Sequence, residues 1–323
     1  MPLLDRRNLI LAGALATMVP PASAAPGDTP GPDGDEVELW PRGAPGGQNV
    51  TVREEIIERN PAGPLRDRFA QHVTRPTLTL FHPRIAWNGI TLLIVPGGGY
   101  VRVVIDKEGF EAAEWFAARG FAAAVLRYRL PADGWIAGAN APVHDARRAM
   151  RLLRKRLPLA GSAHRTGIIG FSAGGHLCGR LITEPALDYV HEDDADAMSA
   201  TPDFAVLMYP VIDTAGKAAH GGSVDQLRRA GVAAAELARH SPARNVTPST
   251  PATLLVHAGD DTSVPVENSL MMYGALLKHG VRSELHVFDS GGHGFGLRGV
   301  QGKNVAVWPT LVANWASSRA PER

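Results

Sequence analysis

The sequence contains a single cysteine, Cys178, among its 323 residues. One cysteine cannot form an intramolecular disulfide, so the fold must be stabilised by its core, and we expect Cys178 to lie in that core. Aromatic residues are scarce at 6%, and the formal net charge is only +1. Without a basic excess the chain lacks the positive field that nucleic acid or an anionic membrane requires, so neither is expected as a partner.

Residues 1–24 have the three parts of a signal peptide. Arg6 and Arg7 precede an apolar core at 9–19, which is too short to span a bilayer, and small residues suited to cleavage follow. The paired arginines predict twin-arginine export, although Asp5 precedes them where Ser or Thr is usual, and an ordinary secretory signal is the alternative. We expect a periplasmic or secreted protein. Cleavage would remove two arginines and one aspartate from 33 basic and 32 acidic residues, which leaves no net formal charge.

The rest of the chain predicts one large α/β domain over 36–323, after a flexible tether at 25–35 that is rich in Pro, Gly and Asp. Apolar strands alternate with amphipathic helices, which predicts a doubly wound, mostly parallel sheet. Strands are expected at 36–40, 77–81, 91–95, 122–128, 166–170, 204–209, 253–257 and 283–288, and helices at 108–119, 143–156, 266–279 and 305–317. Residues 212–250 interrupt the alternation, and an insertion at this point predicts a small lid.

The segment Gly170-Phe171-Ser172-Ala173-Gly174 has the G-x-S-x-G pattern between an expected strand and an expected helix. In that setting the serine occupies a sharp turn that exposes its hydroxyl at the end of the sheet. The following helix directs its first N–H groups towards the same space. We therefore predict that Ser172 is a nucleophile.

A serine hydroxyl needs a base to remove its proton, and the base needs a group that orients it. In α/β-hydrolases the acid and then the histidine follow the serine along the chain. Asp260 and Asp261 follow the strand expected at 253–257, and we choose Asp261, with Asp260 as the close rival. A turn or helix-capping role suits whichever of the two is not catalytic. His293, flanked by glycines after the last strand, is the predicted base.

Three glycines, 97–99, follow the buried strand expected at 91–95. A glycine run there lets the backbone approach a ligand and turn its N–H groups outwards. We expect this loop and the N–H of Ala173 to bind the negative charge of a tetrahedral intermediate, each donor lowering the barrier by roughly 3–4 kcal/mol. Tyr100, directly after the glycines, is expected to contact the substrate.

Together these motifs resemble bacterial α/β-hydrolases of the acetyl esterase, or acetylxylan-esterase-like, group. The matching motifs are L-W-P at 39–41, P-G-G-G-Y at 96–100, Y-R-L-P at 128–131, G-F-S-A-G-G-H-L at 170–177, D-T-S-V-P at 261–265 and G-G-H-G-F-G at 291–296. The resemblance implies hydrolysis of short acyl esters, often acetyl groups on plant-derived carbohydrate, through an acyl-enzyme. It implies a triad of Ser172, His293 and Asp261, and neither a metal nor an organic cofactor. The oxyanion hole that it implies consists of Gly98, Gly99 and Ala173.

Two other functions stay open at this point. A serine peptidase of the prolyl-oligopeptidase type shares the residue order and the G-x-S-x-G-G pattern, but such peptidases normally carry a large propeller domain, for which we see no room here. A catalytically inactive carbohydrate-binding protein on the same scaffold is the other alternative. The intact Ser172, Asp261 and His293 argue against it, so we expect a small-molecule or oligosaccharide ester as the substrate.

Overall fold

The apolar segments before the glycine loop and before Ser172 become two adjacent central strands, β5 (Ile90–Val95) and β7 (Arg165–Phe171). Both are buried along almost their whole length, as expected for strands that helices cover on two faces. The structure is a computed structural model that describes residues 35–156 and 164–319. The expected signal peptide, 1–24, and nearly all of the expected tether, 25–35, lie outside the described residues.

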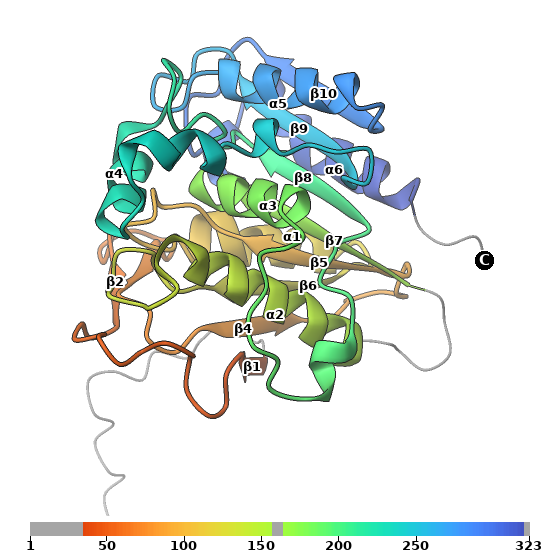
Figure 1. Ribbon diagram of the computed structural model, residues 1–323. Coiled ribbons are helices and arrows are strands. Elements are labelled where there is room, and N and C mark those ends of the chain that lie inside the picture. The colour runs from red at the N-terminus through yellow and green to blue at the C-terminus, as the bar shows by residue number, and fades with distance from the viewer. Residues whose placement is uncertain (1–34, 157–163, 320–323) are drawn as a thin grey trace, which may run out of the picture. The chain divides into compact units, whose positions relative to one another are not determined.

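Eight strands form the main sheet in the order β1-β4-β6-β5-β7-β8-β9-β10 (Figure 1). Strand β4 is antiparallel to both of its neighbours, β1 and β6, and every pairing from β6 to β10 is parallel. The predicted doubly wound, mostly parallel sheet is thereby confirmed. The remaining bounds are β1 Asp35–Glu38, β4 Thr77–Phe81, β6 Ala122–Arg127, β8 Phe204–Met208, β9 Ala252–Ala258 and β10 Ser283–Phe288.

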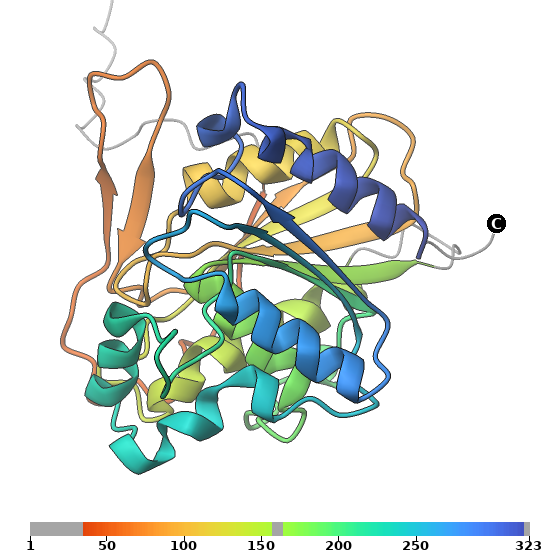
Figure 2. The same ribbon diagram turned by 90° about the horizontal axis from the view of Figure 1, so that it is seen from above.

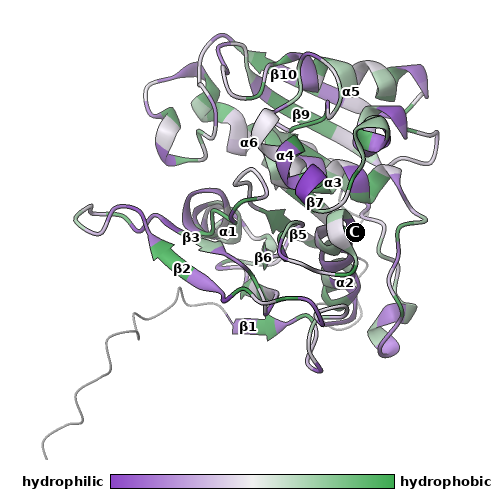
Figure 3. Cartoon of the chain, turned by 60° about the vertical axis from the view of Figure 1, so that its left-hand side comes forward, coloured by the Kyte–Doolittle hydropathy of each residue, from purple (hydrophilic) through white to green (hydrophobic). Residues whose placement is uncertain are grey.

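Helices cover both faces of the sheet (Figure 2). One face carries α1 (Glu111–Ala117) and α6 (Trp308–Ser317), and the other carries α2 (Ala141–Arg156), α3 (Ala173–Thr183) and α5 (Glu267–Lys278). The central strands between these layers, such as β5 and β6, are coloured as hydrophobic in Figure 3. No helix within 35–156 or 164–319 has the length and apolar character that a bilayer crossing requires.

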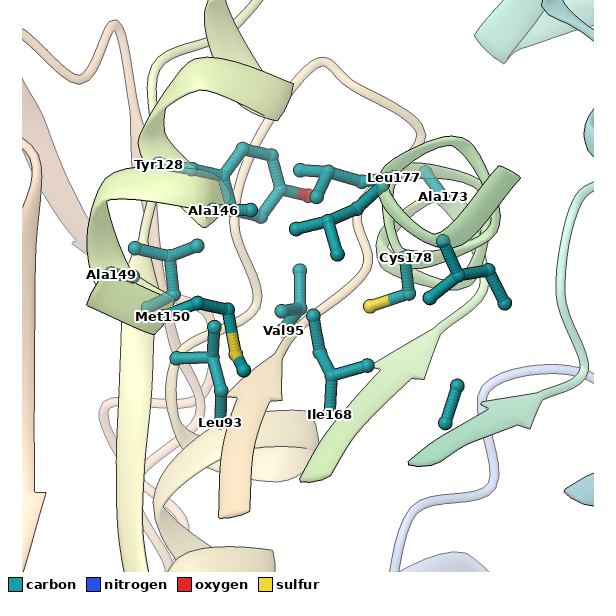
Figure 4. Close-up of a cluster of buried hydrophobic side chains, with 14 of the residues drawn as sticks. Leu93, Val95, Tyr128, Ala146, Ala149, Met150, Ile168, Ala173, Leu177 and Cys178 are labelled. Carbon is teal, nitrogen blue, oxygen red and sulfur yellow. The ribbon is translucent and has the colours of Figure 1, made fainter. Parts of the chain in front are cut away.

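Cys178 lies in the apolar core between α3 and the sheet, as expected. Its side chain is fully buried in the cluster that Figure 4 shows, which also contains Ile168 and Met150. Burial in these surroundings raises the pKa of the thiol well above its ordinary value, so the residue behaves as a small apolar side chain.

A two-stranded hairpin, β2 (Glu55–Glu58) with β3 (Arg68–Gln71), was not predicted. Its four-residue strands, E-I-I-E and R-F-A-Q, are too short and too charged to show the alternation that indicates a strand. The hairpin stands apart from the main sheet in Figure 2. Ala70 and Val103 exchange two backbone hydrogen bonds of 2.9 and 2.7 Å, which hold β3 against the segment that follows the glycine loop.

The helix expected to begin at residue 108 begins later, because a wider helical turn over Asp106–Phe110 precedes α1. Asp106 and Glu108 in that turn are both buried and bind partners outside the helix. Single turns of 3₁₀ helix also occur at Gly138–Asn140, Asp194–Ala197, Arg298–Val300 and Asn304–Val307.

The expected lid, 212–250, contains α4 (Gly221–Arg229) and 3₁₀ turns at Ala234–His240 and Pro242–Arg244. It is anchored to α5 because the side-chain oxygen of Asn268 accepts the N–H groups of Ile212 and Asp213, each at 2.8 Å. The segment follows β8 and therefore begins at the carboxyl end of the parallel strands.

The L-W-P and Y-R-L-P motifs meet at Asp145 in α2. Its carboxylate accepts the indole N–H of Trp40 at 2.7 Å and the backbone N–H of Arg129 at 2.8 Å. The Arg129 guanidinium also contacts it at 2.8 Å, and both charged side chains are fully buried. Removal of either charged partner would leave an uncompensated buried charge. The bond from Trp40 joins the first motif to the same carboxylate and so to α2.

Candidate active site

Ser172 occupies the turn between β7 and α3 with φ 53° and ψ −117°, a conformation that residues with a Cβ rarely adopt. Neighbouring backbone holds it there: its N–H donates to the carbonyl of Met208 at 3.0 Å, and its carbonyl accepts the N–H of Val211 at 3.1 Å. A Cβ on Gly174 would lie 2.3 Å from the carbonyl oxygen of Val95, so only glycine lets α3 start this close to β5. The strained turn is thus imposed by its surroundings.

The side chains of Ser172, His293 and Asp261 form a continuous hydrogen-bonded chain. Ser172 Oγ lies 2.8 Å from His293 Nε2, and His293 Nδ1 lies 2.7 Å from Asp261 Oδ2. The three residues follow β7, β10 and β9, and the carboxyl ends of these parallel strands lie at one edge of the sheet. This geometry lets an imidazole take the hydroxyl proton while a carboxylate fixes the orientation of the ring.

Asp261 is buried and fully engaged. Its Oδ1 accepts the N–H groups of Ser263 and Val264, each at 2.9 Å, and its Oδ2 lies 3.4 Å from His257 as well as close to His293. Burial acts to raise the pKa of Asp261, but the hydrogen bonds from the two histidines outweigh it. The pKa therefore lies well below its usual range, and the group is a carboxylate at neutral pH.

Asp260, the rival for the acid, has a different position. Its Oδ1 accepts the backbone N–H of Gly291 at 2.8 Å and of Gly292 at 2.7 Å. These two glycines directly precede His293, so Asp260 fixes the loop that carries the imidazole. The structure brings Asp261, and not Asp260, to the imidazole itself.

The glycine loop lies directly beside Ser172. A Cβ on Gly97 would come within 2.9 Å of the Ser172 Cβ. Gly98 has φ +132°, and a Cβ there would lie 2.2 Å from the carbonyl oxygen of Arg102. The residues expected to form the oxyanion hole are Gly98, Gly99 and Ala173. Within the described residues their backbone N–H groups have no acceptor, so they are available to a ligand.

Glu108 is a buried carboxyl that the sequence did not single out, and it connects two loops of the site. Its Oε2 accepts the N–H of Gly97 at 2.8 Å, and its Oε1 accepts the hydroxyl of Tyr209 at 3.0 Å. The same hydroxyl accepts the N–H of Gly296 at 3.3 Å, and the ring lies edge-on to His293 with centroids 5.2 Å apart. Burial raises the pKa of Glu108, and the bond from Gly97 and the nearby His293 offset this only in part.

No local pattern indicates this role for Glu108. An acidic residue at the expected start of an amphipathic helix is typical of a favourable interaction with the helix dipole and needs no further explanation. Only the packing of the 106–110 turn under the glycine loop brings the carboxyl to Gly97.

The prediction that Tyr100 contacts the substrate is wrong, because its side chain lies inside the fold. Its φ of +62° turns the side chain into the fold, where it is 2% exposed and its hydroxyl donates to His176 Nδ1 at 2.7 Å. Burial and the nearby Arg180 lower the pKa of His176 to about 3, so the imidazole is neutral and its Nε2 donates to the carbonyl of His240 at 2.8 Å. Tyr100 therefore links the glycine loop to α3 and to the 212–250 segment.

A cavity of about 410 Å³ opens over Ser172 and His293. The glycine loop forms one wall, and the 212–250 segment contributes His220 and Gly222. His220 bonds to Ser223 at 2.8 Å, and burial lowers the pKa of its imidazole. In residues 35–156 and 164–319, no group of three or more His, Cys, Asp or Glu side chains is arranged to hold a metal ion.

Residues 133–317, more than half of the chain, match the model of the prolyl oligopeptidase family. An acetylxylan esterase from Xylanibacter ruminicola is 31% identical over 215 residues, which are 65% of this chain and 42% of that protein. The endo-1,4-beta-xylanase B of Butyrivibrio fibrisolvens is 34% identical over 206 residues, which are 63% of this chain and 32% of that protein. The matches to both relatives thus span less than half of their length.

A solved structure is similar over nearly its whole length. The acetyl ester-xyloside bifunctional hydrolase from Caldicellulosiruptor lactoaceticus is 33% identical, with a TM-score of 0.70, and the match covers 88% of this chain and 96% of that one. The family model, the relatives and this neighbour confirm the resemblance that the motifs indicated. The chain belongs to the prolyl oligopeptidase family, as an α/β-hydrolase of the acetyl-esterase-like group.

Proposed function

We propose that the protein is a serine esterase that removes short acyl groups, acetyl in the first place, from carbohydrate esters. The observation that carries the proposal is the hydrogen-bonded chain from Ser172 through His293 to Asp261, with distances of 2.8 and 2.7 Å, at the base of an open cavity. The names of an acetylxylan esterase and of an acetyl ester-xyloside hydrolase among the similar proteins support the acetyl ester and the carbohydrate.

In the proposed reaction, Ser172 Oγ attacks the ester carbonyl while His293 Nε2 takes its proton. Asp261 holds the imidazole in the required tautomer and stabilises the imidazolium. The imidazolium then protonates the departing alcohol, which leaves an acyl group on Ser172. A water molecule that gives its proton to His293 attacks this acyl-enzyme, and the carboxylic acid and the free serine are released.

The negative charge of each tetrahedral intermediate would be held by the N–H groups of Gly98, Gly99 and Ala173. The bond from Gly97 to Glu108 fixes the first part of that loop before substrate binds, so the donors need little reorganisation during the reaction. We also propose that 212–250 acts as a lid, because it contributes His220 and Gly222 to the cavity wall. Export through the signal peptide at 1–24 would place the enzyme in the periplasm or outside the cell, where polymeric esters occur.

The match to the prolyl oligopeptidase model makes a serine peptidase the second candidate. The same hydrogen-bonded chain can attack an amide, so its geometry alone does not separate the two activities. Parallel assays with 4-nitrophenyl acetate and with an alanyl or prolyl 4-nitroanilide separate them. The proposal requires that the ester is the better substrate by kcat/KM.

The decisive test is turnover of 4-nitrophenyl acetate by the wild type and by Ser172→Ala. We expect kcat to fall by roughly 10⁵- to 10⁶-fold, because the acyl-enzyme cannot form. Ser317→Ala, an exposed serine at the end of α6, is the matched control. Undiminished turnover in Ser172→Ala would refute the proposal, and so would an inactive wild type. Acetate released from acetylated xylan, compared with acetylated monosaccharides, would then define the carbohydrate.

A further inference from the structure

The cavity over Ser172 carries an excess of positive charge that the proposed reaction does not use. Three cationic side chains line it: Arg59, Arg102 and Lys107. Because the reaction needs only the serine, a histidine, a carboxylate and backbone N–H groups, these cations are free to bind another part of the substrate. We propose that the alcohol part of the substrate carries a carboxylate, as uronic acid sugars do, and that Arg102 and Lys107 bind it. This inference rests on the proposed esterase function.

The two cations lie beside the two loops that carry the chemistry. A Cβ on Gly98 would lie 2.8 Å from Cγ of Arg102, so the arginine packs on the oxyanion loop. A Cβ on Gly296 would lie 3.1 Å from Cγ of Lys107, so the lysine packs on the loop that follows His293. An anionic group bound between these side chains would therefore lie close to an ester at Ser172.

Among the described residues, no carboxylate compensates the charges of Arg102 and Lys107. Arg59 is paired with Asp67, but no carboxylate in residues 35–156 or 164–319 lies within 4 Å of the charged group of Arg102 or Lys107. Arg102 instead lies over the ring of Phe69 in β3, 4.9 Å from its centroid, and this contact directs the guanidinium without neutralising it.

The one carboxyl among the cavity-lining residues is already engaged. Both oxygens of Glu108 accept hydrogen bonds, from Gly97 and from Tyr209, and the group is 4% exposed. Asp106, beside Lys107 in sequence, is bound by Arg68 at 2.8 Å. The cavity therefore presents a net positive field, and a cleft lined by one sign of charge concentrates ligands of the opposite sign.

The carboxylate of the proposed substrate is assigned to the alcohol part of the ester for a chemical reason. A short acyl group such as acetyl has no position for a carboxylate, whereas a sugar alcohol does. Arg59, which directly follows β2 in the hairpin, also lines the cavity. The wall therefore extends beyond the glycine loop, which suits an alcohol larger than a single hydroxyl group.

The test compares 4-acetoxybenzoate with its neutral counterpart 4-acetoxybenzamide, which share the acetyl ester and the ring. We expect the wild type to favour the benzoate by kcat/KM, and the preference to shrink as ionic strength rises. An exposed ion pair is worth up to about fivefold in affinity, so Arg102→Gln combined with Lys107→Gln should lower the benzoate-to-benzamide ratio by roughly tenfold, mainly through KM. Replacement of both cations by glutamate should bring the ratio below one.

Arg165→Gln is the matched control, since Arg165 is exposed and begins β7, at the end of the strand opposite to Ser172. Its ratio should equal that of the wild type, and thermal melting of each variant reports folding. A wild type that hydrolyses both esters equally well overturns the anionic-substrate inference and leaves the esterase intact, as does a ratio that the double variant does not change. A wild type that hydrolyses neither overturns both. O-acetylated methyl glucuronoside against O-acetylated methyl glucoside repeats the comparison on sugars.

Discussion

The replacement of Asp261 by asparagine is expected to invert the tautomer of His293. Oδ1 of Asp261 accepts two backbone N–H groups, from Ser263 and Val264, at 2.9 Å. The carbonyl oxygen of an asparagine must stay there, because an amide NH₂ would oppose both donors. The NH₂ group then takes the position of Oδ2, which lies 2.7 Å from His293 Nδ1.

An NH₂ group at that position makes Nδ1 an acceptor, so the imidazole proton moves to Nε2. That nitrogen lies 2.8 Å from Ser172 Oγ and, once protonated, cannot take the serine proton. The same change of tautomer in serine–histidine–aspartate enzymes lowers kcat by about 10⁴-fold. At 1.36 kcal/mol per factor of ten, this is roughly 5.4 kcal/mol of lost transition-state stabilisation.

Asp260→Asn is the neighbouring control. Its Oδ1 alone accepts both Gly291 and Gly292, and an asparagine carbonyl can keep both bonds, so we expect a loss of less than roughly tenfold in kcat. Both variants are assayed with 4-nitrophenyl acetate at saturating concentration, and circular dichroism reports folding. A greater loss in Asp260→Asn than in Asp261→Asn would refute the reasoning and the assignment of the acid.

Three further variants test other contacts of the structure. Gly98→Ala should lower kcat by roughly 10²- to 10³-fold, because its Cβ would meet a carbonyl oxygen at 2.2 Å and displace an oxyanion donor. Gly231 also has a positive φ but has open space around it, so the control variant Gly231→Ala should keep esterase activity. Glu108→Gln should lower kcat about tenfold by weakening the bond that fixes the glycine loop, with KM little changed in steady-state assays. Because burial raises the pKa of Glu108, the folded state holds the carboxyl proton more tightly than the unfolded state does. The stability of the fold therefore falls as the pH rises from the unfolded-state pKa through the folded-state pKa. Melting temperatures at pH 5 and pH 8 should differ less in Glu108→Gln than in the wild type. Asp145→Ala should reduce the free energy of unfolding in urea by roughly 3–5 kcal/mol, since it leaves Arg129 buried without its partner, and a loss below about 1 kcal/mol would contradict the assigned role of the pair.

The elements predicted best are those whose local sequence already matches their environment. β4 and β10 have the predicted bounds, and the central strands are nearly uninterrupted apolar runs because both of their faces are buried. The hairpin of β2 and β3 was missed for the opposite reason. Its short strands are held by long-range contacts, such as the backbone pairing of Ala70 with Val103, that leave no periodic trace in the sequence.

The residue order and the glycines of the sequence by themselves determined which chemistry to expect: a serine on a tight turn, an acid and a histidine after later strands, and a glycine loop after a buried one. These features are local, because each depends on a few neighbouring residues. Only the tertiary structure decided which of Asp260 and Asp261 faces the imidazole, that Tyr100 turns inward, and that Glu108 ties the glycine loop to the histidine loop. Adjacent residues on a loop point in different directions, and which direction meets a partner depends on how distant strands are packed.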